Sequence, residues 1–255
     1  MTWQTIPAHV GTFPHIERSS LLLGVDPGVK MKAPVIMWIL RDSISDEIII
    51  IDTGASDSGW AEQYHHGLVQ SPDQVPRRAL EIYGVDPAKV GIVVNSHLHW
   101  DHSWNNALFP NATVLVQRKE MGYALAPYDV HRVYYEVTGT RAPPWLSSFA
   151  QMHPIDGDYH LRPGVDLIHL PGHTPGSQGV LVQGVHATYL IAGDCIGLRE
   201  NWDGLAGMRH IPSGIHIDLT EYYATFAKMD QIVTSTGARV LPGHDMSVLE
   251  EAAYE

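Results

Sequence analysis

The sequence has a single cysteine, Cys195, and few basic residues. One cysteine cannot form an internal disulfide, so we expect a cytoplasmic protein in which Cys195 is a small buried packing residue. Lysine and arginine number 16 against 28 aspartates and glutamates, which gives a formal net charge of −12. Because this charge repels phosphate backbones, we expect no nucleic-acid partner.

Long apolar runs and internal repeats are also absent from the sequence. No stretch approaches the roughly 20 apolar residues that span a bilayer, so we expect no membrane partner. Residues 1–20 have neither the basic start nor the continuous apolar centre of a targeting segment. A chain of 255 residues is long enough for one sizeable core, and we expect a single domain over residues 1–255.

Short apolar runs alternate along the chain with polar loops that carry histidine or aspartate. We predict a β-hairpin from residues 34–40 and 47–52, and further strands at residues 91–95, 113–117, 165–170, 179–183, 188–192 and 239–241. Helices are predicted around residues 77–83, at 118–125 and at 219–233. Asp218 and Glu221 are placed like a capping box of the last helix, and Gly237 would end it.

Residues 126–162 differ from the rest of the chain. Aromatic residues lie there among prolines and glycines without clean periodicity: Tyr128, Tyr134, Tyr135, Trp145, Phe149 and Tyr159. We expect a partly helical, aromatic-rich insertion that covers a pocket near the functional site.

Histidine is unusually abundant, with 16 residues and no histidine-rich tract, which favours metal chemistry. The strongest motif is Ser96-His-Leu-His-Trp-Asp-His102, directly after a predicted strand. Residues two apart in an extended chain point the same way, so His97 and His99 can hold one ion. Asp101 and His102, where a helix begins, can serve a second ion. The alternative, a solvated histidine-rich turn, is disfavoured by so dense a cluster.

Three more candidate ligands follow later strands. They are His173 in Pro-Gly-His-Thr-Pro-Gly, Asp194 in Gly-Asp and His244 in Pro-Gly-His-Asp. Each sits beside glycine or proline, which can bend the backbone toward a shared edge. Alone, any of them could be an ordinary turn residue; together with the first cluster they indicate a metal site. Nitrogen and carboxylate donors without cysteine argue against a closed structural zinc site and suggest a catalytic one.

The ordered pattern H-x-H-x-D-H, P-G-H-T-P-G, G-D and P-G-H-D resembles the metallo-β-lactamase superfamily. The resemblance implies an α/β protein with a four-layer αββα sandwich. It also implies two divalent metal ions, for which we expect Zn²⁺, with Fe, Mn and Co as alternatives. Under this resemblance His97, His99 and His173 hold the first ion, Asp101, His102 and His244 hold the second, and Asp194 bridges them. Asp52 then matches an aspartate that orients ligands, although it could be an ordinary turn residue.

Two such ions would ionise a bridging water to a hydroxide nucleophile and polarise a carbonyl, with Asp101 and Asp194 as catalytic carboxylates. Within the superfamily, His99 stands where redox members usually have glutamate, and only eleven residues follow His244, where the thioesterase branch usually adds a helical domain. β-Lactamases and nucleases fit less well. The chain is most similar to single-domain lactonases such as N-acyl homoserine lactonases.

This resemblance implies a metal-dependent hydrolase that opens an N-acyl homoserine lactone-like cyclic ester, a small-molecule substrate, with quorum quenching as its role and a homodimer by analogy. An amidase, esterase or thioesterase of the same fold is the alternative within enzymes. The alternative outside enzymes is a non-catalytic metal-binding module.

One departure from the lactonases is Gly197, which stands where they usually place an assisting tyrosine. Candidates to replace it are Tyr128, Tyr134, Tyr135, Tyr222, Tyr223 and Arg199, each of which could equally serve packing or the surface. Trp100, Trp104, Trp145 and Trp202 lie in or near the loops of the site, where they either line an apolar pocket or fill the core or a subunit contact.

Overall fold

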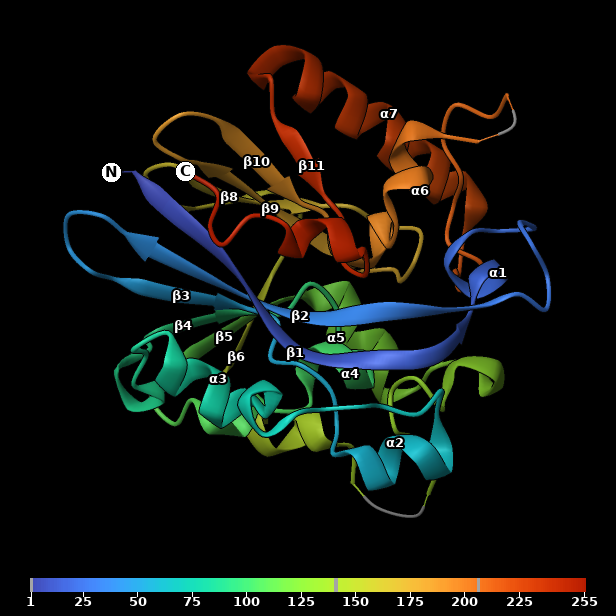
Figure 1. Cartoon of the computed structure of the whole chain (residues 1–255), viewed down its shortest axis with the longest axis horizontal. Coiled ribbons are helices and arrows are strands. Elements are labelled where there is room, and N and C mark those ends of the chain that lie inside the picture. The colour runs from blue at the N-terminus through green and yellow to red at the C-terminus, as the bar shows by residue number, and fades with distance from the viewer. Residues whose placement is uncertain (1, 140–141, 206) are drawn as a thin grey trace.

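Two mixed β-sheets face each other at the centre of the molecule, with helices on both outer sides (Figure 1). The structure is a computed structural model, and it describes residues 2–139, 142–205 and 207–255. The order of layers is helices, sheet, sheet, helices, which confirms the predicted αββα sandwich.

The larger sheet has six strands in the spatial order β1-β2-β3-β4-β5-β6. They are β1 (Trp3–Glu17), β2 (Lys30–Asp42), β3 (Ile48–Ile51), β4 (Ile92–Val94), β5 (Thr113–Gln117) and β6 (Met152–Ile155). β1, β2 and β3 pair antiparallel, and β3 to β6 pair parallel.

The second sheet has five strands in the order β11-β10-β9-β8-β7. They are β7 (Tyr159–Arg162), β8 (Val165–His169), β9 (Gln178–Gln183), β10 (Thr188–Ile191) and β11 (Arg239–Leu241). β10 and β11 pair parallel, whereas the other neighbours pair antiparallel.

Helices cover the outer face of each sheet. On the side of the six-stranded sheet lie α2 (Ser58–Tyr64), α3 (Pro76–Ile82), α4 (Trp100–Ser103) and α5 (Arg118–Leu125), and on the other side α6 (Arg199–Asp203) and α7 (Leu219–Thr236) (Figure 1). The short α1 (Arg18–Leu21) follows β1. Turns of 3₁₀ helix occur at Pro72–Gln74, Pro87–Lys89, Asn106–Leu108, Asp129–His131, Pro144–Gln151, Gly193–Ile196 and Met246–Leu249. Within the described ranges, no helix is both long enough and apolar enough to cross a bilayer.

The core has one layer between the sheets and one under each helical layer. The uninterrupted apolar run Ile48–Ile51 contributes to two of these layers. Ile49 and Ile51 point between the sheets, while Ile50 points toward the helices. Strands buried on both faces read as continuous apolar runs rather than as alternating ones. Under α7, Tyr222 and Phe226 pack against the second sheet.

The predicted hairpin and the later strands are confirmed, as are α3, α5 and α7. The Asp218 carboxylate caps α7 by accepting from the amides of Thr220 and Glu221, and Gly237 ends the helix in the left-handed conformation. β1 was not predicted from the sequence. This strand contains Pro7, Pro14 and a register shift beside Gly11, features that weaken a strand pattern but are tolerated at a sheet edge, where β1 lies.

The predicted insertion at 126–162 ends earlier than expected. Residues 152–155 and 159–162 form β6 and β7, which belong to the two sheets. Pro154 obscured β6 in the sequence, yet β6 is an edge strand, where proline is tolerated. The remaining segment contains 3₁₀ turns at 129–131 and 144–151, and residues 140 and 141 lie outside the described residues.

Candidate metal centre

The predicted ligands all lie in loops that follow strands of the two sheets. His97, His99, Asp101 and His102 follow β4, His173 follows β8, Asp194 follows β10 and His244 follows β11. β10 and β11 run parallel, so their carboxyl ends carry Asp194 and His244 to the same edge. The structure brings all seven residues together in three overlapping groups of possible ligands.

His97, His99 and His173 form the first group, in which the candidate ligand atoms lie within 4.8 Å of one another. His99 has extended backbone angles, the ring centroids of His97 and His99 lie 4.4 Å apart, and Leu98 packs in a small apolar cluster that contains neither of them. His173 Nε2 lies 3.2 Å from His99 Nδ1. The imidazoles of His97 and His99 therefore lie on one side of the chain, as the alternation predicted from the sequence requires.

Asp101, His102 and His244 form the group on the other side of the centre. Asp101 Oδ2 lies 3.5 Å from His102 Nε2 and 3.6 Å from His244 Nε2. Asp101 and His102 belong to α4, whose start at Trp100 turns them away from His97 and His99.

Asp194 lies between the two groups. Its Oδ1 is 3.0 Å from His244 Nε2 and 3.1 Å from His102 Nε2, whereas its Oδ2 is 3.5 Å from His173 Nε2. One carboxylate thus reaches imidazoles of both groups, as a bridging ligand would.

Hydrogen bonds outside the centre orient three of the imidazoles. The Nδ1 atom of His173 lies 2.7 Å from the carbonyl oxygen of Ile215, and that of His244 lies 2.9 Å from the carbonyl oxygen of Pro34. A carbonyl can only accept, so each Nδ1 donates, which leaves each Nε2 as the nitrogen that faces the centre and could bind a cation.

Asp52 orients the third imidazole. Its Oδ2 lies 2.8 Å from His102 Nδ1, and the carboxylate also accepts from the amide and the hydroxyl of Ser96, both at 2.7 Å. The residue is buried and has a φ of 57°. Asp52 therefore contacts a candidate ligand instead of lying in a solvated turn.

Burial and charge act differently on the two sides of the centre. Burial lowers the pKa of His97 and His99 well below the ordinary value, so these imidazoles are neutral. Burial also opposes ionisation of His102, but the negative charges of Asp194, Asp101 and Asp52 raise its pKa well above the usual value. The Asp194 carboxyl is buried too, yet His244 and His102 hold its pKa well below the normal range.

The donor atoms fit a pair of cations. Three buried atoms of the centre form no hydrogen bond to any described residue: His97 Nε2, His102 Nε2 and Asp194 Oδ1. Buried polar atoms rarely remain without partners, and two cations, one at each ligand group, would satisfy all three. Cys195 is not a donor here, because its Sγ points at Met229 Sδ, 3.8 Å away, and burial raises the pKa of its thiol.

Glu120 ties two ligand loops together, and the sequence analysis missed it. The side chain is fully buried, and its Oε1 accepts from the Leu98 amide at 3.0 Å and from the Tyr135 hydroxyl at 2.9 Å. Its Oε2 accepts from the Thr174 hydroxyl at 2.6 Å and from the Gly176 amide at 3.2 Å. A charged residue in the first turn of a helix usually faces solvent, so the sequence carried no signal for this role.

Of the six candidates to replace the tyrosine absent at Gly197, Tyr134 lines the cavity at the centre, together with His99 and Asp101. Its ring centroid lies 5.3 Å from that of His99, and its hydroxyl forms no hydrogen bond within the described part of the chain. The others are engaged or exposed: the hydroxyl of Tyr135 donates to Glu120 and that of Tyr222 to the Asp194 and Cys195 carbonyls, Arg199 contacts Ser247, and Tyr128 and Tyr223 are exposed.

Only one of the four tryptophans considered lines this cavity. Trp100 does so, stacked on His65 at a centroid distance of 3.8 Å. Trp104, Trp145 and Trp202 pack in three different core clusters. Trp100 therefore lines the pocket and also packs in the core, whereas Trp104, Trp145 and Trp202 fill the core alone.

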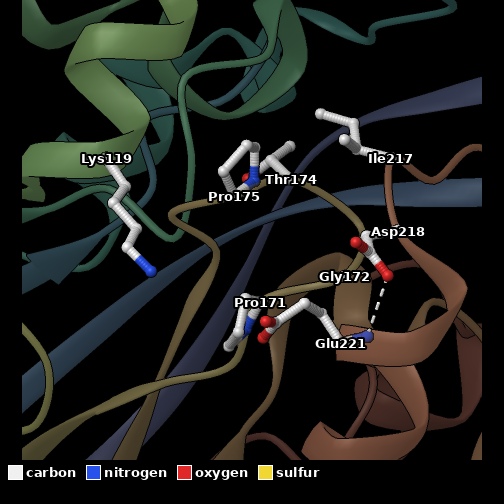
Figure 2. Close-up of a pocket in the computed structure, with 8 residues that line it drawn as sticks. All are labelled: Lys119, Pro171, Gly172, Thr174, Pro175, Ile217, Asp218 and Glu221. Atoms are coloured by element: carbon white, nitrogen blue, oxygen red, sulfur yellow. Dashed lines mark hydrogen bonds between the residues drawn. The ribbon is translucent and has the colours of Figure 1, made fainter.

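A separate cavity of about 190 Å³ lies beside the His173 loop (Figure 2). Figure 2 shows Lys119 on one side of it, Pro171 and Pro175 along the loop, and Asp218 and Glu221 at the start of α7. It shares no lining residue with the cavity at the centre.

Known proteins resemble this chain over most of its length. The family model described as the metallo-beta-lactamase superfamily matches residues 34–244. An N-acyl homoserine lactonase from a Bacillus species is 26% identical over 241 residues, covering 91% of this chain and 89% of the relative. An N-acyl homoserine lactonase from Azorhizobium caulinodans is 32% identical over 168 residues, which is 64% of this chain and 60% of the relative.

Solved structures show the same fold. A quorum-quenching N-acyl homoserine lactone lactonase superposes with a TM-score of 0.78 at 23% identity, covering 97% of this chain and 94% of that one. An N-acyl homoserine lactone hydrolase with the product N-hexanoyl-L-homoserine bound at its catalytic metal centre has a TM-score of 0.78 at 22% identity, with 98% and 96% coverage.

Proposed function

This chain belongs to the metallo-beta-lactamase superfamily as a metal-dependent hydrolase, and we propose that it is a lactonase that opens a cyclic ester at a two-metal centre. The relatives named as N-acyl homoserine lactonases support the choice of a lactone over other carboxylic substrates. The observation that carries the proposal is Asp194, whose two carboxylate oxygens face imidazoles of both ligand groups.

We assign His97, His99 and His173 to one cation and Asp101, His102 and His244 to the other, with Asp194 between them. Nitrogen and carboxylate donors favour Zn²⁺, and Fe, Mn or Co would use the same donors. Two divalent cations held by these residues would supply a Lewis acid for the carbonyl and would lower the pKa of water toward neutrality.

Two carboxylates of the chain are proposed to transfer the proton that moves during the reaction. Hydrolysis of a lactone adds water across the acyl carbon–oxygen bond, so one proton must move from water to the leaving alkoxide. We propose that Asp101 and Asp194 accept this proton and return it, because both carboxylates lie at the centre among the candidate ligands.

Tyr134 is the proposed hydrogen-bond donor to the substrate oxygen. Burial and the nearby charge of Asp101 raise the pKa of its hydroxyl, so the group stays protonated. It lines the same cavity as His99 and Asp101 and has no competing partner among the described residues. The Tyr134 hydroxyl would therefore donate to the substrate the hydrogen bond that Gly197, which has no side chain, cannot donate.

A substrate panel tests the proposal. The protein is loaded with Zn²⁺, its metal content is measured, and acid release is followed in a pH-stat with lactones, linear esters, amides and thioesters. We expect acid release from lactones, abolished by a chelator and restored by Zn²⁺. Turnover confined to linear esters, amides or thioesters would move the assignment to one of those classes, and no turnover with two ions bound would favour a binding module.

A further inference from the structure

Two cavities meet at His66. The inner cavity, at the metal centre, measures about 20 Å³ and is walled by Phe13, His66, Trp100 and Tyr134 among others. The outer cavity measures about 430 Å³ and is lined by His15, Glu17, Ser20, Lys30, Glu62, His65, His66 and Gly67. His66 lines both, and its ring centroid lies 6.0 Å from that of Phe13.

The inner cavity has room for the reacting group alone. A single water needs roughly 10–15 Å³ of such space, whereas ligand pockets usually measure about 300–1,000 Å³. The outer cavity falls within that range. A substituent on the ester ring must therefore extend out of the inner cavity. Because His66 lines both the inner and the outer cavity, the outer cavity is the space that we assign to this substituent.

The outer cavity has a polar wall. Apart from Gly67, every lining residue has a side chain with a nitrogen or oxygen that can form hydrogen bonds. His65 is already bonded to Glu136, and Glu17 accepts from Ser19 and from the Gly28 amide. Five other lining side chains form no hydrogen bond to a described residue: His15, Ser20, Lys30, Glu62 and His66.

His66 is the most informative of these five, because it is only partly exposed and also lines the inner cavity. Burial lowers the pKa of its imidazole, so the ring is neutral and offers one donor and one acceptor. Lys30 adds a cation, and Glu62 adds an anion. The free groups thus suit a ligand that is neutral and carries several hydrogen-bonding groups.

We propose that the outer cavity binds the substituent of the substrate and selects a neutral, hydroxylated substituent over an alkyl chain. The inference rests on the proposed lactonase activity and adds the substrate class. An alkyl chain in this cavity would strip water from charged side chains without replacing their hydrogen bonds. The cavity in Figure 2 has an apolar side formed by Pro171, Pro175 and Ile217, but no residue joins it to the inner cavity.

The test compares five-membered lactones with the Zn²⁺-loaded protein. The set contains unsubstituted γ-butyrolactone, a polyhydroxylated lactone, an alkyl lactone of equal size, and N-acyl homoserine lactones with acyl chains of increasing length. We expect kcat/KM for the hydroxylated lactone to exceed that for the alkyl lactone at least tenfold, with no gain along the acyl series. A rise of roughly fourfold per methylene, which an apolar wall would give, would overturn the inference.

Turnover of γ-butyrolactone separates the two proposals. If it is hydrolysed and alkyl chains are preferred, the lactonase proposal stands and the polar selection fails. If no lactone is hydrolysed, both fail. A preference for the hydroxylated lactone supports both.

Variants locate the selection in the outer cavity. We expect His66→Phe to raise KM for the hydroxylated lactone about tenfold and to reduce its advantage over the alkyl lactone, with the smaller effect on kcat. Lys30→Met, an exposed substitution, should shift the same ratio if His66→Phe does not fold. His186→Phe, on an exposed turn between β9 and β10, is the matched control. An unchanged ratio in both cavity variants would refute the assignment.

Discussion

The Glu120 carboxylate accepts a hydrogen bond from the Leu98 amide at 3.0 Å, between the two histidines that begin the metal motif. The same carboxylate accepts from Thr174 and Gly176, on the loop that carries His173. Glu120 is therefore a positioning residue that holds the ligands of one proposed cation in register, although it does not face the cation itself.

Glu120→Gln tests this positioning. The amide group of glutamine would face the Gly176 or Leu98 amide with a donor instead of an acceptor. We expect a loss of about 1–3 kcal/mol in the free energy of unfolding for each buried donor left unpaired, and weaker Zn²⁺ binding by chelator competition. Glu81→Gln, at an exposed position on α3, should change neither quantity. Unchanged Zn²⁺ affinity would leave Glu120 a purely structural residue.

Asp52→Asn tests the support of His102. The asparagine side chain no longer offers a charged acceptor to the imidazole, so we expect Zn²⁺ affinity to fall about 10–100-fold. Asp46→Asn is a close control, because Asp46 has the same φ of 57° and an exposed side chain. Equal Zn²⁺ affinities of the two variants in a chelator titration would contradict the proposed contact.

Tyr134→Phe removes only the hydroxyl of a residue that lines the cavity at the centre. Loss of a donor to a developing oxyanion typically costs about 10²–10³-fold in kcat, and we expect a decrease of that order with little change in metal content. Steady-state kinetics on γ-butyrolactone measures it. Tyr128→Phe, at an exposed position of the same segment, should behave like the unmodified protein. A wild-type kcat in Tyr134→Phe would remove the residue from the reaction.

Gly176→Ala and Gly122→Ala should have opposite effects on stability. A Cβ at Gly176 would lie 2.4 Å from the backbone nitrogen of Glu120, so we expect the free energy of unfolding to fall by about 1–3 kcal/mol or more. A Cβ at Gly122, on the exposed side of α5, would meet no atom within 4 Å, and alanine should stabilise the helix by roughly 0.5–1 kcal/mol. Urea unfolding of the chelated proteins would show both changes, and effects of the same sign would contradict this reading.

Metal removal should lower stability without unfolding the protein. The three large core clusters are made by the sheets and helices and do not include the candidate ligands. Each cation at 100 times its Kd would add about 2.7 kcal/mol, so thermal unfolding should shift upward with Zn²⁺ concentration. Collapse of the far-ultraviolet circular dichroism on chelation would show instead that the cations are needed for the fold.

The sequence predicted the parts of the site that follow local rules. His97 and His99 were paired through the two-residue period of an extended chain, and Asp52, His173, Asp194 and His244 each follow an apolar strand. The strands themselves were recognisable where both faces are buried, as in Ile48–Ile51. These features depend on short stretches of chain and on strand ends meeting at one edge.

Long-range packing set the features that the sequence did not reveal. In the sequence, Glu120 is indistinguishable from a solvated helix residue. Its buried position depends on hydrogen-bond donors from three distant segments. His66 has no motif around it, and its position depends on how α2 packs near Phe13. β1 was concealed by its prolines, which only its place at the sheet edge makes acceptable.

The ligands are distributed along the chain so that the centre can be completed only at the end of synthesis. A nascent polypeptide that has emerged as far as β8 and the loop after it already carries His97, His99 and His173. His244 is the last donor to be translated, and it reaches the edge only when β11 pairs with β10. Because a domain generally folds as a unit, the group of Asp101, His102 and His244 can form only after the last strand has been synthesised.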